Sequence, residues 1–307
     1  MKLKIIPNRK YYYFFSGLLF VASLVSLFLW GLRPGLDFTG GSLMELSFAT
    51  SRPGSQEVSA ALVPLNLGDL IVQQAGEKEI MLRFKAVDEA THQGILQTIS
   101  DKFAADSPEQ IKELQFESIG PVIGKELQQK AWWQIFLVSL GIIIYIAFAF
   151  RKVSKPLASW KYGVSAIIAL LHDIVIVAGF FSVLGHFFNV EIDALFITAL
   201  LTIMGFSVHD TIVVFDRTRE NITRHHGGTF AEVVNDSVNQ TIVRSVNTSL
   251  TVLLVLLSLY ILGGATIKNF VLALLFGIAI GTYSSIFVAS PVIVDWNNFG
   301  KKTKSAR

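Results

Sequence analysis

Residues 162–186 read YGVSAIIALLHDIVIVAGFFSVLGH, a run with no lysine, arginine or glutamate and with a single aspartate. A helix needs about 20 mainly apolar residues to cross a bilayer, so this run predicts a membrane-spanning helix. Five further blocks have the same apolar character: 11–32, 131–150, 192–215, 246–262 and 270–294. The sequence therefore predicts an α-helical membrane protein with six transmembrane helices. Apolar runs of this length exclude an outer-membrane barrel, whose strands are short and alternate in polarity.

The composition agrees with a membrane protein. Of the 307 residues 52% are hydrophobic and only 16% are charged, against about 25% charged residues in soluble globular chains. The absence of cysteine excludes a disulfide framework and thiolate chemistry. A net charge of +3 is modest and indicates no nucleic-acid partner.

The basic residues indicate how the chain is oriented. They gather before the first block, after the second, between the fourth and fifth, and at the C-terminal end. If the six blocks cross in turn, these four places lie on one side, which the positive-inside rule makes the cytoplasm. We therefore expect a multi-pass protein of the cytoplasmic (inner) membrane, with both termini cytoplasmic and residues 33–130 exported. The first block is too long for a cleaved signal peptide and no A-x-A-like site follows it, so we interpret it as an uncleaved helix.

The exported segment has the pattern of a small α+β domain. Its expected elements alternate as strand, helix, strand, strand, helix and strand, with a hairpin turn at Gly76. They cover residues 41–48, 55–67, 69–74, 79–85, 88–104 and 109–119. This order is typical of a ferredoxin-like fold.

The whole chain is then expected to have four regions. These are the N-terminus with the first helix (1–32), the exported domain (33–130), the remaining five helices (131–296) and a basic cytoplasmic tail (297–307). His225-His226-Gly227-Gly228 should break the chain after the fourth helix. Thr229 and Glu232 then form a capping box before an apolar stripe. They predict a cytoplasmic amphipathic helix over about 229–245, lying on the membrane surface before it turns into the fifth span.

Two ionisable pairs lie inside predicted spans, His172-Asp173 in the third and His209-Asp210 in the fourth. A carboxylate near the bilayer centre costs about 2.5–3.5 kcal/mol, so such a residue normally faces the helix bundle or a water-filled cavity. If the fifth helix packs beside the fourth, the guanidinium of Arg244 can reach Asp210. A neighbouring arginine favours the ionised carboxylate and desolvation favours the neutral acid. Such a balance suits a group that exchanges a proton.

Structural roles compete with this hypothesis. His172 can simply hydrogen-bond a neighbouring carbonyl group, and Asp173 can tie two helices together. Asp210 and Arg244 can form a static buried pair, and a basic residue at position 244 also fits the orientation rule.

Two rows of small residues predict close helix contacts. Thr202, Gly205 and His209 share one row of the fourth helix, with Ser207 and Asp210 beside it, and this polar, small-residue seam suits burial against another helix. In the last helix a small residue recurs at every fourth position, which is typical of a close-packing face and is a first candidate for a subunit contact. Its members are Ala273, Gly277, Gly281 and Ser285.

Several motifs together resemble one family. GLDFTGG at 35–41 resembles the G-x-D-F-T-G-G signature of the SecF family, and SIGPVIG at 118–124 resembles the family's motif before the second helix. LHD at 171–173, GFSVHDTIVVFDR at 205–217 and NQTIVRSVNT at 239–248 follow in the family's order. One difference is His209, where the family pattern has asparagine. The motif and candidate hinge residues are Gly35, Asp37, Phe38, Thr39, Gly40, Gly41, Gly120, Pro121 and Gly124.

The resemblance implies a function and partners. SecF proteins pair with SecD, associate with the SecYEG channel, with SecA and YajC as further partners, and help to pull preproteins outward. The work is attributed to the proton-motive force. By the same resemblance Asp210 is the proton-carrying aspartate and Arg244 its partner. The other ionisable residues of the two pairs, His172, Asp173 and His209, are further candidates for proton coupling.

Two other classes compete with this function. One is a proton-coupled small-molecule or lipid exporter of the resistance-nodulation superfamily, which shares the six-helix unit but usually has larger exported domains. The other is an intramembrane metalloenzyme that uses the two His-Asp pairs, although no metal-ligand spacing such as H-E-x-x-H is present. Neither a Walker sequence, a glycine-rich dinucleotide loop nor a G-x-S-x-G motif occurs. We therefore expect no enzyme activity, cofactor or metal.

Overall fold

The computed structural model describes residues 3–49, 52–75, 77–104, 111–149, 158–224 and 228–305. The expected turn at Gly76, the chain break at 225–227 and the basic residues 151–155 lie outside these ranges. The chain divides into two compact units, one made of Met1–Arg33 with Trp132–Arg307 and the other of Pro34–Ala131. The first unit is helical, and the second contains a sheet.

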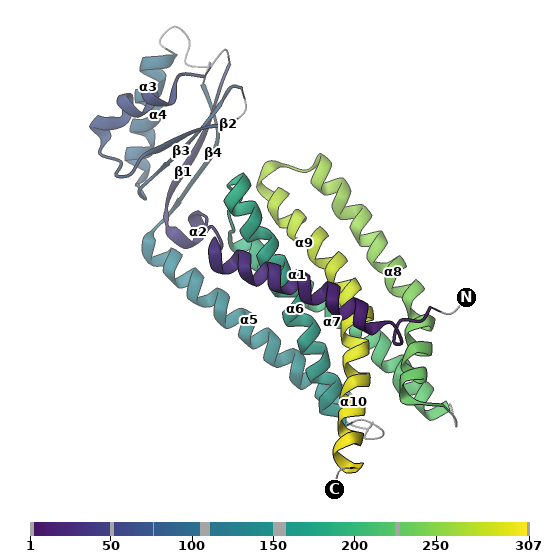
Figure 1. The fold of residues 1–307 in the computed structure, drawn as a ribbon. Helices are drawn as coiled ribbons and strands as arrows, with labels where there is room; N and C mark the ends of the chain where they lie inside the picture. The colour runs from purple at the N-terminus through teal and green to yellow at the C-terminus, as the bar shows by residue number, and fades with distance from the viewer. Residues whose placement is uncertain are drawn as a thin grey trace. The chain divides into compact units, whose positions relative to one another are not determined.

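Six helices of the described chain are long and apolar enough to cross a membrane, which confirms the six predicted spans (Figure 1). They are α1 (Arg9–Leu29), α5 (Pro121–Ala149), α6 (Ser159–Phe188), α7 (Ala194–Arg224), α8 (Phe230–Leu262) and a sixth span over Thr266–Asn298. The sixth span joins α9 (Ala265–Ser284), the π-helical segment η3 (Ser285–Ala289) and α10, which ends at Ser305.

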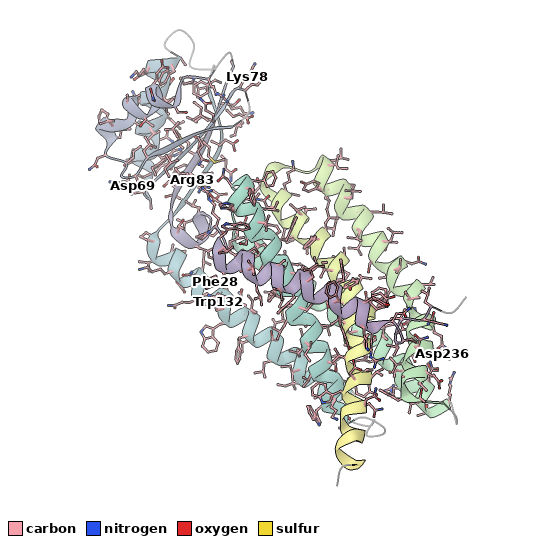
Figure 2. The ribbon with its side chains drawn as sticks, in the orientation of Figure 1. Phe28, Asp69, Lys78, Arg83, Trp132 and Asp236 are labelled. Carbon is pink, nitrogen blue, oxygen red and sulfur yellow. The ribbon has the colours of Figure 1, made fainter. Side chains whose placement is uncertain are left out.

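The centre of the helical unit is formed by α6, α7 and the sixth span, since about half of the apolar part of each is buried inside the chain. In contrast, α1, α5 and α8 expose most of their apolar side chains. Phe28 of α1 and Trp132 of α5 are 90% and 70% exposed, and both project from their helices (Figure 2). Such apolar outer surfaces suit contact with lipid tails or with other membrane helices.

Helix α8 differs from the expectation at its N-terminal half. The predicted capping box is confirmed, because Glu232 N donates to Thr229 Oγ1 and Thr229 N donates to Glu232 Oε2. However, the expected turn between a surface helix over 229–245 and the fifth span is absent from the described residues, and α8 is one continuous helix. Two causes are visible. Residues 230–262 contain no glycine or proline to break the helix, and Val234, Ser237 and Val238 are buried against the bundle.

The smaller unit confirms the ferredoxin-like prediction. Its elements are β1 (Gly41–Phe48), α3 (Ser55–Leu62), the short 3₁₀ turn η1 (Val63–Leu65), β2 (Ile71–Ala75), β3 (Glu79–Phe84), α4 (Glu89–Phe103) and β4 (Ile111–Ile119). The sheet order is β2-β3-β1-β4, and each neighbouring pair is antiparallel. The helices α3 and α4 cover one face of this sheet (Figure 1).

The core of the small unit follows from alternation along its strands. Buried and half-buried residues alternate along β1 and β3, as expected for a sheet with one covered face. The buried side chains of both strands meet those of the helices in one apolar cluster. It includes Met44, Leu46, Phe48, Ile80, Leu82, Phe84, Val58, Leu62, Ile95 and Ile99.

The two glycine-rich motifs lie against each other at the base of this unit. A Cβ atom at Gly40 would lie 2.8 Å from Pro121 Cα, and one at Gly124 would lie 3.1 Å from Gly40 N and Phe38 O. Gly40 also has a positive φ of 70°, which side chains disfavour. The glycines therefore allow the short helix α2 (Leu36–Thr39) and the start of α5 to approach backbone to backbone. Their role as hinges stays a prediction.

Candidate functional site

The most enclosed carboxylate of the bundle is Asp173 of α6, which is 1% exposed. Its Oδ2 atom accepts hydrogen bonds from Ser207 Oγ at 2.6 Å and from Ser284 Oγ at 2.7 Å. Its Oδ1 atom lies 3.0 Å from His172 Nδ1. Three helical spans therefore converge on one carboxylate. This is the hydrogen-bonding that a charge away from water requires.

His172 is held between this carboxylate and α1. Its ring lies parallel to that of Phe20, with the ring centroids 6.3 Å apart. The expected hydrogen bond to a neighbouring carbonyl group is replaced by the contact with Asp173, which is a stronger acceptor when it is ionised. His172 Nε2 is buried and has no hydrogen-bond partner among the described residues.

A second carboxylate, Asp210, lies one helical turn beyond Ser207 on α7 and is 7% exposed. It faces the hydroxyl groups of Ser245 and Ser249 on α8 and of Thr282 on α9. Ser249 Oγ and Thr282 Oγ1 are themselves 2.5 Å apart. Asp210 thus lies where α7, α8 and the sixth span meet.

The two carboxylates belong to one polar seam through the bundle. Ser207 binds Asp173 and shares a face of α7 with Asp210, while the sixth span supplies Ser284 to one carboxylate and Thr282 to the other. A Cβ atom at Gly281 would lie 3.0 Å from Ser207 Cβ. The missing side chain at 281 therefore allows α9 to pack closely on α7 at the seam.

The predicted row of small residues in the last helix does form a close-packing face, but inside the chain. A side chain at Gly277 would overlap Ile203 of α7, as one at Gly281 would crowd Ser207. This row is therefore not available as a subunit contact, which corrects that expectation. Ser284 is the last residue before the π-helical segment, whose first residue, Ser285, accepts a hydrogen bond at its backbone oxygen from Ser290 Oγ, five residues further along the chain. Local π-helical turns of this kind occur frequently at functional sites.

The expected contact between Asp210 and Arg244 is not formed among the described residues. Arg244 is exposed, whereas Ser245 and Ser249 are the buried positions of that part of α8. The small hydroxyl side chains allow α8 to pack near Asp210, where an arginine would not fit. The residue of α8 that faces Asp210 is therefore Ser245, one position after Arg244.

His209 also lies on the outside of the bundle. Both His209 and Gly205 are exposed, and a Cβ atom at Gly205 would meet no described atom within 4 Å. The expected burial is therefore wrong for Gly205 and His209, whereas Ser207 and Asp210 beside them are buried. The five named proton-coupling residues thus separate into an inner set, His172, Asp173 and Asp210, and an outer pair.

The hydroxyl partners were largely missed by sequence reasoning. Ser245, Ser249, Thr282 and Ser284 lie in apolar helices, where serine and threonine commonly bond their own helix backbone. Only Ser207 stood out, because it is close to Asp210 in sequence. The sequence shows which face of α7 carries Asp210. It does not show which face of α8 or of the sixth span turns toward Asp210, because that depends on how the helices pack.

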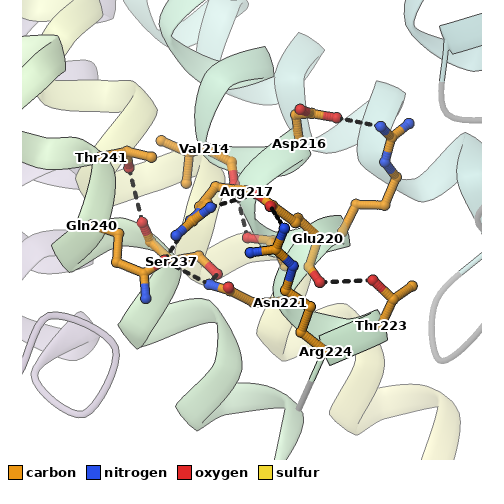
Figure 3. Close-up of polar contacts among 12 residues, drawn as sticks. Val214, Asp216, Arg217, Glu220, Asn221, Thr223, Arg224, Ser237, Gln240 and Thr241 are labelled. Carbon is orange, nitrogen blue, oxygen red and sulfur yellow. Dashed lines mark hydrogen bonds and ion pairs between the residues drawn. The ribbon is translucent and has the colours of Figure 1, made fainter.

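The end of α7 and the beginning of α8 are joined by a further polar cluster, shown in Figure 3. Asn221 Nδ2 donates to Ser237 Oγ at 2.9 Å and to Gln240 Oε1 at 3.0 Å. Arg217 pairs with Glu220, which also binds Arg224 at 2.8 Å. These charged residues therefore lie beside a buried contact between two helices.

The helical unit also fixes its own N-terminal segment. Asn239 Oδ1 accepts from Leu3 N at 2.7 Å, and both Asn235 and Asn239 donate to Leu3 O. Near it, Arg9 pairs with Asp295 of α10 at 2.9 Å. No three His, Asp or Glu side chains are grouped as metal ligands would be among the residues that the structure describes.

Comparisons with known proteins agree with this architecture. Residues 98–299 match the family described as "Protein export membrane protein SecD/SecF, C-terminal", and residues 25–51 match the "SecD/SecF GG Motif". The second range contains the motif at 35–41, and the first contains both His-Asp pairs.

The relatives that match over nearly the whole chain are named protein translocase subunit SecF. The protein translocase subunit SecF of Thermobaculum terrenum is 46% identical, over 96% of this chain and 94% of the relative. That of Anaerolinea thermophila is 38% identical over the same shares. These relatives are named as translocase subunits and not as hydrolases or small-molecule exporters.

A solved structure has the same fold. The crystal structure of SecDF, described as a translocon-associated membrane protein from Thermus thermophilus, matches with a TM-score of 0.80 and 33% identity. The match covers 97% of this chain but only 39% of the SecDF chain, so this chain spans about two fifths of that protein. The chain has six apolar helices with a four-stranded domain between the first two of them, and its relatives match it over nearly its whole length. It therefore belongs to the SecF family of protein translocase subunits.

Proposed function

We propose that this chain works with SecD in the Sec translocase of the inner membrane and uses the proton-motive force to complete preprotein export. SecYEG is the proposed channel, and SecA and YajC are further proposed partners. Both termini then face the cytoplasm, and the sheet-containing unit faces the exported side. The polar seam between Asp173 and Asp210 carries this proposal, because buried carboxylates inside membrane spans normally serve ion or proton pathways.

In the proposed cycle the carboxylates of Asp173 and Asp210 each take up and release a proton. Asp210 is the proposed carrier, since its hydroxyl neighbours come from two other spans and bond partly to each other. Asp173, with His172, is the proposed second station, and Ser207 lies between the two. One charge that moves across 100 mV supplies about 2.3 kcal/mol, which shifts a two-state equilibrium by about 50-fold.

We propose that Arg244 acts at the edge of the polar seam, as a partner that approaches Asp210 during the cycle. It shares a helical face with Ser237 and Gln240, which hydrogen-bond to α7 near Asn221. Since residues 237–240 lie opposite 221, and 245–249 lie opposite 210, Arg244 is about one turn, or about 5 Å along the axis, from the level of Asp210. Its side chain is long enough to swing toward Asp210 during a cycle.

The outer face of α7 is the proposed contact with SecD. It presents Thr198, Thr202, Gly205 and His209, which are small or polar residues in a lipid-length helix. Membrane helices associate through such residues. Because the chain has no cysteine, Gly205→Cys can be cross-linked to single-cysteine variants of SecD, and Ile144→Cys on the exposed side of α5 is a matched control. Cross-linking at 144 but not at 205 would contradict this assignment.

The central experiment follows export of a secreted reporter in cells that lack their own SecF. Asp210→Asn keeps the size and hydrogen-bonding capacity of the side chain but cannot carry a proton. We expect it to co-purify with SecD at the normal level and to fail in export. Asp216→Asn, an exposed carboxylate on the same helix that pairs with Arg219, should export normally. Normal export by Asp210→Asn would refute the proposed carrier, and loss of co-purification would indicate a structural role instead.

A further inference from the structure

In the sheet-containing unit one buried histidine lies between two carboxylates. His92 of α4 is 6% exposed. Its Nδ1 atom lies 3.1 Å from Glu89 Oε1, and its Nε2 atom lies 3.1 Å from Glu113 Oε1 of β4. The ring also stacks on Phe116, with the centroids 3.8 Å apart and the planes 4° from parallel. His92 therefore contacts the edge strand of the sheet through Nε2 and one ring face, while Nδ1 contacts Glu89 of its own helix.

A β-bulge builds this arrangement. Residues three apart in a regular strand point to opposite faces, so Glu113 and Phe116 should not both face α4. The pairing between β1 and β4 shifts, however, because Glu45 pairs with Gln115 whereas Leu46 pairs with Glu113. Position 114 is thus an extra residue, and it turns Glu113 to the side of Phe116. Bulges at sheet edges redirect side chains in this way.

The chemistry of the ring makes the arrangement sensitive to protonation. A neutral imidazole has one N–H group and one lone pair, so it can donate to only one of the two carboxylates. The other carboxylate then faces a lone pair, which is repulsive. An imidazolium donates to both, and such charge-assisted hydrogen bonds are the stronger kind.

The charged neighbours support the ionised form of this cluster. Hydrogen bonds from Gln93 and from His92 lower the pKa of the Glu89 carboxyl group, so it is ionised in the range where histidines titrate. The other elements around His92 present different groups. β1 contributes Met44 and Leu46 to the core, Glu57 of α3 binds Gly54 N, and Lys112 of β4 is exposed.

We propose that His92, Glu89 and Glu113 form a proton-operated clasp that ties α4 to β4 when the imidazole is protonated and loosens when it is neutral. The clasp acts on a strand with a direct continuation, since β4 ends at Ile119 and α5 begins at Pro121. Protonation of a soluble domain thereby stiffens the strand that leads into a membrane-spanning helix. This inference rests on the geometry of the domain and is independent of the proposed proton path in the bundle.

Amide hydrogen exchange of the purified full-length chain in lipid nanodiscs tests the clasp. After correction for the intrinsic pH dependence of exchange, we expect peptides that cover 111–119 to be at least 3-fold more protected at pH 5.5 than at pH 8. Glu113→Gln should abolish this difference. Glu117→Gln, an exposed change on the same strand, should retain it. Equal corrected protection of wild type at both pH values, or an unchanged difference in Glu113→Gln, would overturn the proposal.

A direct measurement covers the case in which Glu113→Gln does not fold. Histidine labelled with ¹³C at the ring Cε1 reports the protonation of each imidazole by NMR, and the signal of His92 is the one missing in His92→Gln. We expect this signal to change from the neutral to the doubly protonated form over the same pH range as the exchange of β4. A ring that stays neutral at pH 5.5 would also refute the clasp.

Discussion

The contact between α1 and α6 gives the sharpest quantitative prediction, at Gly179. A Cβ atom at this position would lie 2.5 Å from Ser23 Cα and 2.7 Å from Ser23 Oγ. The same contact contains two hydrogen bonds between the helices, from Ser26 Oγ to Gly179 O at 3.1 Å and from Ser182 Oγ to Ser26 O at 2.9 Å. We therefore expect Gly179→Ala to separate α1 from α6.

The size of the effect follows from these distances. Ordinary contact begins near 3.4 Å, whereas the nearest atom, Ser23 Cβ, would lie only 2.3 Å away, so the helices must move apart by about 1.1 Å. Overpacking of this kind costs about 1–3 kcal/mol. The movement also stretches two hydrogen bonds, which are worth about 0.6 kcal/mol each inside membrane proteins. We expect Gly179→Ala to lower the free energy of unfolding by about 2–4 kcal/mol.

Reversible unfolding of the purified chain in mixed detergent and SDS micelles measures this free energy. Trp30 reports on the contact, because its ring stacks on that of His186 of α6 with the centroids 4.6 Å apart. The control is Gly17→Ala on the same α1 helix, where a Cβ atom would meet no described atom within 4 Å. It should be neutral or slightly stabilising, because alanine favours helix. Equal stabilities of the Gly179 and Gly17 variants would refute the described packing of α1 on α6.

Three further changes test other parts of the structure. Gly277→Ala should cost about 1–3 kcal/mol by overlap with Ile203, and the same SDS titration would measure it. Burial and the nearby Glu79 raise the pKa of Glu45, so its ionised form opposes folding at neutral pH and this cost disappears as the pH falls through the raised pKa. Glu45→Gln should therefore stabilise the sheet unit at pH 7 by up to about 0.5 kcal/mol and have no effect at pH 4, as thermal unfolding would show. Asn239→Leu removes two of the hydrogen bonds that hold the N-terminal segment and leaves those of Asn235, so trypsin should remove that segment faster; an unchanged rate would contradict the contact.

The sequence was sufficient for those features that depend on local pattern. Six spans follow from apolar runs of bilayer length, and the ferredoxin-like order follows from alternation and helical periodicity in the segment between the first two spans. The capping box at Thr229 is local as well, and the structure confirms it. The continuity of α8 is not local, because burial of Val234 and Ser237 against the bundle decides it.

The site was predictable only to the level of its carboxylates. An aspartate far from the ends of an apolar run is conspicuous, so Asp173 and Asp210 stood out without any knowledge of packing. Their partners did not, since the choice between Arg244 and Ser245 depends on a rotation of about 100° between adjacent residues of a helix. Sequence alone does not fix that rotation when both faces of a helix carry polar groups.

Asp173 and Asp210 differ in how firmly their hydrogen-bond partners hold them, and we propose different roles for the two carboxylates. Asp173 has a hydrogen-bond partner on each oxygen from three sources, and any change of its charge disturbs two serines on two other spans. Two of the hydroxyls that face Asp210, those of Ser249 and Thr282, also bond to each other, so we expect its surroundings to rearrange at little cost in the proposed proton exchange. Ser207 links the first group to the second through one turn of α7. We therefore propose that a change of charge at Asp210 alters the packing of α8, while the firmly bonded Asp173 keeps the centre of the bundle intact.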